Sequence, residues 1–232
     1  MITTLDVVHP DPGELVGEGN EAHPMRQVTR QVAFDPAGWT PERAVKVAEL
    51  FDGLAPEWHT RLSSERMVSL TDALERGGVD EAVAAVAASA AASRSAAARP
   101  LVVELGSGTG FGTPLLVERY GRVVAMDLAL EMLRHADTGA GPAAPRVQAD
   151  AARLPLLDGA VAALVLVNML LFPTEVERIV APGGVVVWVN SLGERTPIHL
   201  PAEDVAMALP SRWDGVASRA AGGTWCVLRR AA

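Results

Sequence analysis

Closely spaced glycines directly follow a short apolar run near the middle of the chain. Residues 101–105 read LVVEL, and glycines then stand at 106, 108 and 110. Glycine lets the backbone turn sharply and lets a ligand approach without a Cβ in the way. In an open parallel sheet, ligands bind outside the carboxyl ends of the strands. The segment therefore predicts a buried strand, a ligand-binding loop and a following helix, which restricts the chain to an α/β fold.

Alternating strand and helix patterns continue from this segment to the C-terminus. Apolar runs predict strands at 101–105, 123–127, 146–149, 160–168 and 185–190. Helical patterns lie at 112–120, 129–136, 174–181 and 202–209. Two final runs, 215–219 and 224–229, flank a pair of glycines and predict an antiparallel hairpin. The alternation predicts a mainly parallel sheet with helices on both faces and right-handed crossovers.

The first hundred residues show different patterns. Residues 1–40 are rich in Pro, Gly and Glu, and we interpret them as an extended N-terminal arm. Helical spacing follows at 41–54 and 57–76, and the alanine-rich stretch 80–98 predicts a helix in its first half. We therefore divide the chain into an arm (1–40), a helical lid or cap (41–98) and a ligand-binding sheet domain (99–232).

Composition narrows the classes of function. The net charge of −8 and the pI near 5.1 disfavour binding of nucleic acid through its phosphates. Cys226 is the only cysteine, which excludes an intrachain disulfide and a cysteine-based zinc site, and we predict no metal. The longest apolar run, 160–172, is too short to span a bilayer, and the N-terminus lacks a signal-peptide pattern. We expect a cytoplasmic protein with no membrane partner, and the single lysine, Lys46, with abundant alanine indicates a GC-rich bacterial source.

The spacing of the glycines separates two classes of ligand. The dinucleotide fingerprint G-x-G-x-x-G, counted from Gly106, requires glycine at 111, where this chain has Phe111. The chain instead reads G-x-G-x-G, and no basic residue lies between Glu104 and Glu118 to meet a pyrophosphate. We therefore expect a compact ligand without a phosphate. The alternative is a glycine-rich turn that binds nothing.

Carboxylates follow the next two predicted strands. Asp127 ends the strand at 123–127, where it can accept hydrogen bonds from both hydroxyls of a ribose, or alternatively cap the next helix. Asp150 follows the third strand and can accept from the exocyclic amine of an adenine, while the N–H of Ala151 serves a ring nitrogen. The alternative for Asp150 is a loop aspartate in a turn. Because these groups follow consecutive strands, one adenosine could contact them all.

Four segments together resemble the class I S-adenosylmethionine-dependent methyltransferases, a Rossmann-like family. They are VELGSGTG at 103–110, VVAMD at 123–127, QADAARLPLLDGAVAALV at 148–165 and APGGVVVWV at 181–189. The resemblance implies S-adenosylmethionine as cofactor and S-adenosylhomocysteine as product. It implies that Glu104 orders the glycine loop and reaches the methionine end, that Asp127 holds the ribose, and that Asp150 meets the adenine.

The cofactor-binding residues implied by the resemblance lie at or after the ends of the first four predicted strands of the sheet domain. They are Glu104, Gly106, Ser107, Gly108, Thr109, Gly110, Asp127, Leu128, Met132, Asp150, Ala151, Asn168 and Met169. The chain departs from the family pattern between Asn168 and Pro182, where the segment is short. This departure predicts either a pocket open on one side or a pocket covered by the N-terminal arm.

Three side chains are candidates for a catalytic role. Asn168 ends the fourth strand of the sheet domain, a position that faces the methyl group in this family. His59 and His199 are candidate bases because neutral imidazole is available at pH 7. The alternatives are a strand-end amide that bonds the backbone and histidines on the surface or in packing. Candidate aromatic walls, with core packing as their alternative, are Phe51, Trp58 and Trp188.

Three functions are compatible with these features. The first is methyl transfer from S-adenosylmethionine to a small-molecule acceptor, in which the sulfonium supplies an electrophilic methyl and the protein holds donor and acceptor in line. The second is a non-catalytic S-adenosylmethionine-binding protein, because no base is obvious. The third is a nicotinamide-dependent oxidoreductase, against which Phe111 argues. We expect a monomer or a homodimer, and the acceptor and the atom that receives the methyl remain open.

Overall fold

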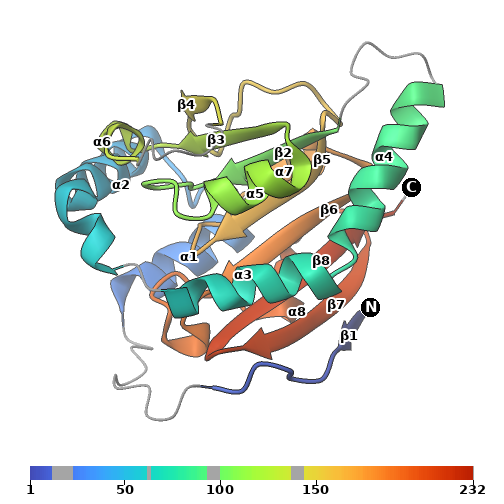
Figure 1. The fold of residues 1–232 in the computed structure, drawn as a ribbon. Helices are drawn as coiled ribbons and strands as arrows, with labels where there is room; N and C mark the ends of the chain where they lie inside the picture. Colours follow the sequence, from blue (N-terminus) through green and yellow to red (C-terminus); the bar gives the residue numbers. More distant parts are fainter. Residues whose placement is uncertain (12–22, 62–63, 93–99, 137–143, 232) are drawn as a thin grey trace.

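The computed structural model describes residues 1–11, 23–61, 64–92, 100–136 and 144–231. Its centre is one eight-stranded sheet in the order β1-β7-β8-β6-β5-β2-β3-β4 (Figure 1). All strand pairs are parallel except those that β8 makes with β6 and β7. The strands are β1 Ile2–Thr4, β2 Leu101–Leu105, β3 Val123–Asp127, β4 Arg146–Gln148, β5 Val161–Val167, β6 Val180–Asn190, β7 Trp213–Ala220 and β8 Gly223–Arg230.

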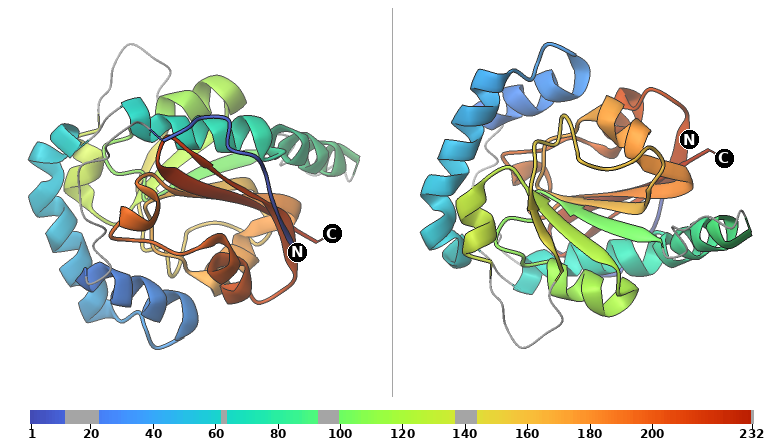
Figure 2. Two further views of the ribbon diagram at one scale, coloured as in Figure 1. Left: turned by 90° about the horizontal axis from the view of Figure 1, so that it is seen from below. Right: turned by 90° about the horizontal axis from the view of Figure 1, so that it is seen from above.

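Helices cover both faces of the sheet (Figure 2). The α-helices are α1 Pro24–Phe34, α2 Pro41–Leu54, α3 Ser64–Arg76, α4 Val79–Ala92, α5 Thr113–Tyr120, α6 Leu130–Arg134, α7 Pro173–Ile179 and α8 Ala202–Ala208. Two 3-10 helices are η1 Ala55–Arg61 and η2 Gly193–Arg195. Buried side chains of α3, α4 and α5 form one core with the sheet, and those of α1, α7 and α8 form the other. The predicted fold, a mainly parallel sheet between helices, is confirmed.

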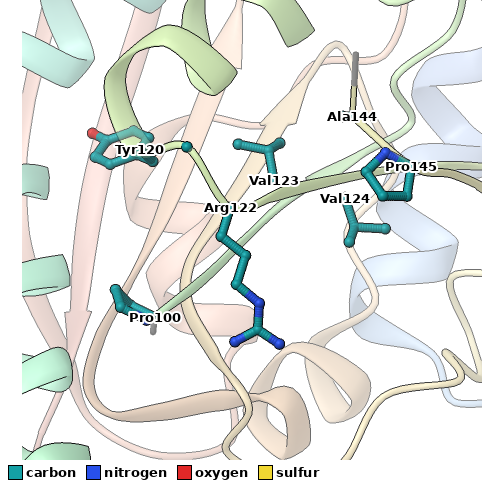
Figure 3. A pocket seen from close by; sticks show the side chains of 8 residues that line it. Pro100, Tyr120, Arg122, Val123, Val124, Ala144 and Pro145 are labelled. Carbon is teal, nitrogen blue, oxygen red and sulfur yellow. The ribbon is translucent and has the colours of Figure 1, made fainter. Parts of the chain in front are cut away.

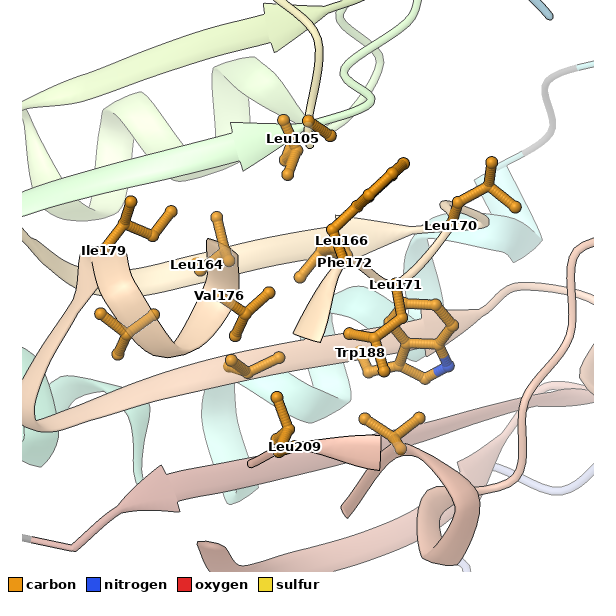
Figure 4. Close-up of a cluster of buried hydrophobic side chains, with 14 of the residues drawn as sticks. Leu105, Leu164, Leu166, Leu170, Leu171, Phe172, Val176, Ile179, Trp188 and Leu209 are labelled. Carbon is orange, nitrogen blue, oxygen red and sulfur yellow. The ribbon is translucent and has the colours of Figure 1, made fainter. Parts of the chain in front are cut away.

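Strand β5 illustrates why this sequence forms a central strand. Its first six residues are buried, and they divide between the two cores, with Leu164 and Leu166 on one side and Val165 on the other. A strand that is buried on both faces is apolar throughout rather than alternating. Figure 4 shows Leu164 and Leu166 against Val176 and Ile179 of α7. This packing fixes the carboxyl ends of β5 and its neighbours, where the candidate site residues lie.

The C-terminal hairpin is confirmed and is longer than predicted, because β7 and β8 pair from Trp213 with Arg230 to Ala220 with Gly223. The structure corrects the start of the strand predicted at 185–190, which we expected to follow a turn at Pro182, Gly183 and Gly184. Strand β6 already begins at Val180, and its register against β5 shifts across the Pro-Gly-Gly segment. The segment is therefore an irregularity within a strand rather than a turn that precedes one.

The prediction of an extended arm over 1–40 was wrong for much of its described part. Residues 2–4 form β1 and pair with β7, and residues 24–34 form α1. Pro24 opens α1, and the side chain of His23 accepts a hydrogen bond from the backbone N–H of Met25. Val32 and Ala33 are then buried against the core. Helix α1 is therefore amphipathic, and the arm prediction missed a helical pattern within a Pro- and Gly-rich segment.

The helices between 41 and 92 divide into two groups. The single helix predicted over 57–76 is wrong, because η1 and α3 are separate elements. Helices α3 and α4 pack directly on the sheet, where Leu74 and Ala82 are fully buried, so they form a layer of the sheet fold rather than a lid. Helix α2 instead contacts α6 at the end of the sheet that carries the glycine loop (Figure 1). The boundary predicted at residue 98 stays a prediction.

Candidate functional site

The glycine loop follows β2 and bends back over the end of β3. The backbone N–H groups of Gly106 and Ser107 donate to the carbonyl of Met126, at 2.8 and 3.0 Å. Gly106 has φ +71°, and a Cβ there would lie 2.5 Å from Sδ of Met169. A side chain at Gly106 would therefore be both strained and in collision with a neighbour. The side chain of Met169, a predicted cofactor contact, lies directly on this loop.

Glu104 lies beneath the loop, at 4% exposure. The hydroxyl of Thr113, the first residue of α5, donates to its Oε2, and a Cβ on Gly112 would lie 2.7 Å from its Oε1. Burial, together with repulsion from Asp127, raises the pKa of Glu104 to about 7. Glu104 therefore ties the strand to the start of the helix from within, and contact with the methionine end of a cofactor stays a prediction.

Asp127 stands at the end of β3 with both carboxylate oxygens in use. Oδ2 accepts from the N–H of Gly108 at 2.8 Å, and Oδ1 accepts from the N–H of Ala129 at 2.9 Å. Burial raises the pKa of Asp127, these N–H groups oppose that shift, and the charge of Asp52 adds to it. The bond to Ala129 closes a turn before α6 and is not the cap alternative, because Ala129 is itself the N-cap of α6 and that helix has no side-chain cap hydrogen bond. This turn is the structural role of Asp127. It does not exclude the ribose role, because each carboxylate oxygen has a second lone pair.

Asp150 lies after β4, next to the buried Ala151. Its Oδ1 accepts from the N–H of Ala152 at 2.9 Å, which is the turn alternative. Its two oxygens also accept from the indole nitrogen of Trp39, at 3.0 and 3.1 Å. The ring of Trp39 meets Phe172 edge-on, with centroids 5.1 Å apart. Trp39 was not among the predicted site residues, and its only signal was a lone tryptophan in a Pro- and Gly-rich segment.

The segment from Trp39 to Trp58 therefore covers the carboxyl edge of the sheet. The side chain of Asp52 accepts from the N–H of Glu131, the second residue of α6, at 2.7 Å. The Nε1 atom of Trp58 would lie 3.6 Å from a Cβ on Gly108. The short segment before Pro182 predicted either an open pocket or a pocket covered by the N-terminal arm. In the structure the edge is covered by Trp39 of that arm, together with Asp52 and Trp58 from the helices after it.

Met132, a predicted cofactor contact, and Trp188, a candidate aromatic wall, are both buried. Met132 is 1% exposed and packs in a cluster with Phe51, Ala55 and Trp58, and its contact with a cofactor stays a prediction. Trp188 is 2% exposed and donates to Oδ1 of Asn190, so it belongs to the core and is not an aromatic wall (Figure 4).

The remaining predicted residues line the loop or its surroundings. Thr109 and Gly110 are half-buried, and Leu128 is half-buried with its carbonyl accepting from Gln148 at 3.1 Å. Phe51 and Trp58 meet edge-on at 5.8 Å. Ser107 is buried, and its hydroxyl has no hydrogen-bond partner among the described residues. A buried hydroxyl without a partner indicates that another group bonds to it when the site is filled.

Asn168 connects the ends of β5 and β6. It has φ +52°, a conformation that asparagine tolerates better than most residues. Its Oδ1 accepts from the N–H of Ser191 at 2.9 Å, and its Nδ2 donates to the hydroxyl of Ser191 at 2.8 Å. Both ends of the amide are therefore engaged in joining two strands, which corresponds to the structural alternative.

The two candidate histidines have different surroundings. His59 is exposed on η1, next to Trp58. His199 is 9% exposed, and its Nδ1 lies 3.4 Å from Nη1 of Arg26. Burial, with the nearby charge of Arg26, lowers the pKa of His199, so it is neutral at pH 7. The structure does not bring these two histidines together.

A cavity of about 570 Å³ lies at the opposite end of the sheet from the glycine loop (Figure 3). Tyr120, Arg122 and Pro145 are among the residues that line it, near the starts of β2 and β3. We assign no role to this cavity. In the part of the chain that the structure describes, no three potential metal ligands cluster and no helix is long and apolar enough to cross a membrane.

Comparison with known proteins agrees with this arrangement. Residues 102–184 match the family described as a methyltransferase domain. No curated protein matches the chain. The structure of a DhpI-SAH complex is 19% identical, covers 79% of this chain and 95% of its own, and has a TM-score of 0.54, which shows a shared fold. The predicted Rossmann-like fold is confirmed, and residues 102–184 are similar to a methyltransferase domain.

Two further solved structures align less well. A SAM-dependent methyltransferase from Aquifex aeolicus is 17% identical, with 68% of this chain and 92% of that chain covered and a TM-score of 0.49. Geranyl diphosphate C-methyltransferase from Streptomyces coelicolor A3(2) is 19% identical, with 39% and 37% covered and a TM-score of 0.36. In three solved structures, the last one among them, the match spans only 41%, 37% and 38% of the structure's own length.

Proposed function

We propose that this chain, which carries a class I methyltransferase domain at residues 102–184, transfers the methyl group of S-adenosylmethionine to a small-molecule acceptor. The observation that carries the proposal is the common location of three carboxylates. Glu104, Asp127 and Asp150 lie at or just after the ends of β2, β3 and β4, which are adjacent and parallel. The loop between them has no basic residue that would favour a pyrophosphate.

The residues at this edge fit the cofactor. Asp127 has lone pairs left for the ribose hydroxyls, Asp150 has them for the adenine amine, and the unpartnered hydroxyl of Ser107 lies in the loop between them. Glu104 is the acidic group beneath the loop, where a positively charged methionine portion would favour its ionised form. The bound cofactor would supply an electrophilic methyl, so the protein needs no activation of the donor.

The chain itself contributes position and exclusion of water. Asn168 and Ser191 hold the ends of β5 and β6 in a fixed relation, next to Met169 on the glycine loop. Trp39 and Trp58 cover the same edge from the N-terminal segment. Holding two reactants in attack geometry supplies much of the rate gain in a displacement of this kind. A base is needed mainly for an acceptor that is a weakly acidic hydroxyl or a protonated amine.

The test is a titration of the full chain with three ligands. S-adenosylmethionine and S-adenosylhomocysteine are expected to bind in a calorimeter, and NAD is not. Binding of NAD alone would contradict the proposal and favour an oxidoreductase. Incubation with labelled S-adenosylmethionine and a metabolite extract of the source organism then identifies the compound that gains the label.

A non-catalytic S-adenosylmethionine-binding protein is the second candidate. It is favoured by the engagement of two candidate catalytic side chains, since the amide of Asn168 bonds Ser191 and the Nδ1 of His199 faces Arg26. The two candidates differ in one result. Tight cofactor binding without methyl transfer to any component of the extract would establish the second.

A further inference from the structure

Arg26 in the first turn of α1 has a guanidinium group that is only partly satisfied. Its Nε and Nη2 atoms are buried and have no hydrogen-bond partner among the described residues. The described part of the chain contains no carboxylate within ion-pair distance of Arg26, and the first turn of α1 has no acidic residue. Burying part of a charged group without a partner is costly. The position therefore requires an acceptor that the described residues do not supply.

The neighbour of Arg26 is also a donor. Because a guanidinium only donates hydrogen bonds, the Nδ1 of His199, 3.4 Å from Nη1, accepts, and the proton of the neutral ring lies on Nε2. Two acidic residues, Glu194 and Asp204, act on His199 from nearby, but Asp204 is already paired with Arg30. The contact with His199 therefore uses Nη1 of Arg26 and leaves Nε and Nη2 without an acceptor among the described residues.

The pair lies at the edge of the sheet where the candidate site is found. The residues on either side of His199 are tied to the end of β6, because the carbonyl of Ile198 accepts from Asn190 at 2.9 Å and that of Leu200 accepts from Trp188 at 3.3 Å. The next residue after β6 is Ser191, which bonds Asn168. Arg26 therefore lies beside the strand ends at which the proposed function places the methyl acceptor.

We propose that Arg26 and His199 form a recognition site for one anionic group, a carboxylate or a phosphate-type oxyanion, carried by the methyl acceptor. This inference rests on the proposed function for the identity of the bearer. The Nε and Nη2 atoms lie on the same edge of a guanidinium, so their N–H groups form the parallel pair that binds an oxyanion with two hydrogen bonds. His199 accepts from Nη1 and so holds the guanidinium in place, which leaves the Nε and Nη2 edge for the anion. In a chain with net charge −8, this pair provides local selection for a negatively charged small molecule.

The site is tested with simple anions on the full chain. Acetate and inorganic phosphate are titrated while the ¹H–¹⁵N signal of the Arg26 Nε–H group is followed by NMR, with acetamide as the uncharged probe. Acetate and phosphate are expected to shift this signal in a saturable manner, and acetamide is not. Equal shifts with acetamide, or no shift with either anion, would overturn the inference, whether or not any variant folds.

A matched pair of variants assigns the effect to one side chain. Arg26→Lys keeps the charge but removes the paired N–H groups, and anion affinity is expected to fall at least tenfold. Arg30→Lys makes the same change one turn later, at an exposed residue paired with Asp204, and is expected to stay within twofold of the parent. Equal affinities in the two variants would contradict the assignment.

The same titrations separate this inference from the proposed function. They are performed both without cofactor and with S-adenosylhomocysteine. If neither methionine-derived ligand binds but the Arg26 signal responds to anions, the proposed function fails and the anion site remains. If the cofactor binds and the signal does not respond, the anion site alone is wrong.

Discussion

The indole nitrogen of Trp39 lies 3.0 Å from Oδ1 and 3.1 Å from Oδ2 of Asp150. This contact joins the segment between α1 and α2 to the end of β4, over a sequence distance of 111 residues. The carboxylate involved is the one that the family resemblance assigns to the adenine amine. We therefore expect cofactor binding and the position of the N-terminal segment to be coupled through this acceptor group.

Removing the indole N–H should free that acceptor. Trp39→Phe keeps an aromatic ring against Phe172 but removes the donor, so S-adenosylmethionine is expected to bind about three- to tenfold more tightly, the scale of one net hydrogen bond. Calorimetry measures the change. Trp213→Phe is the control, because the nitrogen of Trp213 donates to Glu177 far from this edge. Weaker binding in Trp39→Phe would mean that the indole orders Asp150 for the cofactor instead.

Asp127 is the residue whose loss should most directly weaken cofactor binding. Asp127→Ala is expected to cost roughly 1.5–3 kcal/mol of binding free energy, the scale for hydrogen bonds to a charged group. Asp214→Ala, a change of the same kind on β7, should leave the affinity unchanged. Because Asp127 also accepts from Gly108 and Ala129, the folding of the variant is checked by thermal unfolding. An unchanged affinity in a folded Asp127→Ala protein would exclude the ribose role.

The raised pKa of Glu104 predicts a specific pH dependence of stability. With a folded-state pKa of about 7 against 4.5, the folded protein binds more protons than the unfolded chain between these values, so the free energy of unfolding falls as pH rises from 4.5 to 7. The difference corresponds to about 3 kcal/mol. Glu104→Gln should remove this slope, while the exposed Glu118→Gln should keep it.

Urea unfolding of the parent and both variants between pH 5 and pH 8 measures this contribution. Parallel curves for the parent and Glu104→Gln would show that Glu104 is ionised throughout this range.

The contact between Gly106 and Met169 can be separated from the backbone strain of the glycine. Gly106 and Gly121 have nearly the same φ, +71° and +72°, but a Cβ on Gly121 would have nothing within 4 Å. Gly121→Ala therefore measures the backbone strain of a side chain at positive φ without a collision, roughly 1–3 kcal/mol of unfolding free energy. Gly106→Ala should be destabilised further by collision with Met169.

Adding Met169→Ala to Gly106→Ala tests the source of the excess. The second change should recover part of the lost stability, because it removes the atoms that the new Cβ meets. Thermal or urea unfolding provides the comparison. Equal destabilisation at Gly106 and Gly121 would contradict a close contact with Met169.

The sequence by itself determined the sheet, its glycine loop and the carboxylates after its strands. These features depend on residues that are close in the chain, such as the apolar strand that runs into Gly106 and the aspartate that ends β3. Periodicity and spacing report such local relations directly. The prediction of an extended arm missed α1, because the Pro- and Gly-rich composition of 1–40 obscured an amphipathic pattern that packs against the distant core.

Only the tertiary structure decided what covers the site and which candidates are already engaged. Trp39 on Asp150, Arg26 beside His199 and Asn168 bonded to Ser191 each join segments that the sequence separates. No spacing rule relates such residues, because their approach depends on how helices and strands pack around a shared core. For the same reason the sequence left two roles open for Trp188, an aromatic wall or core packing, and only the structure places it in the core.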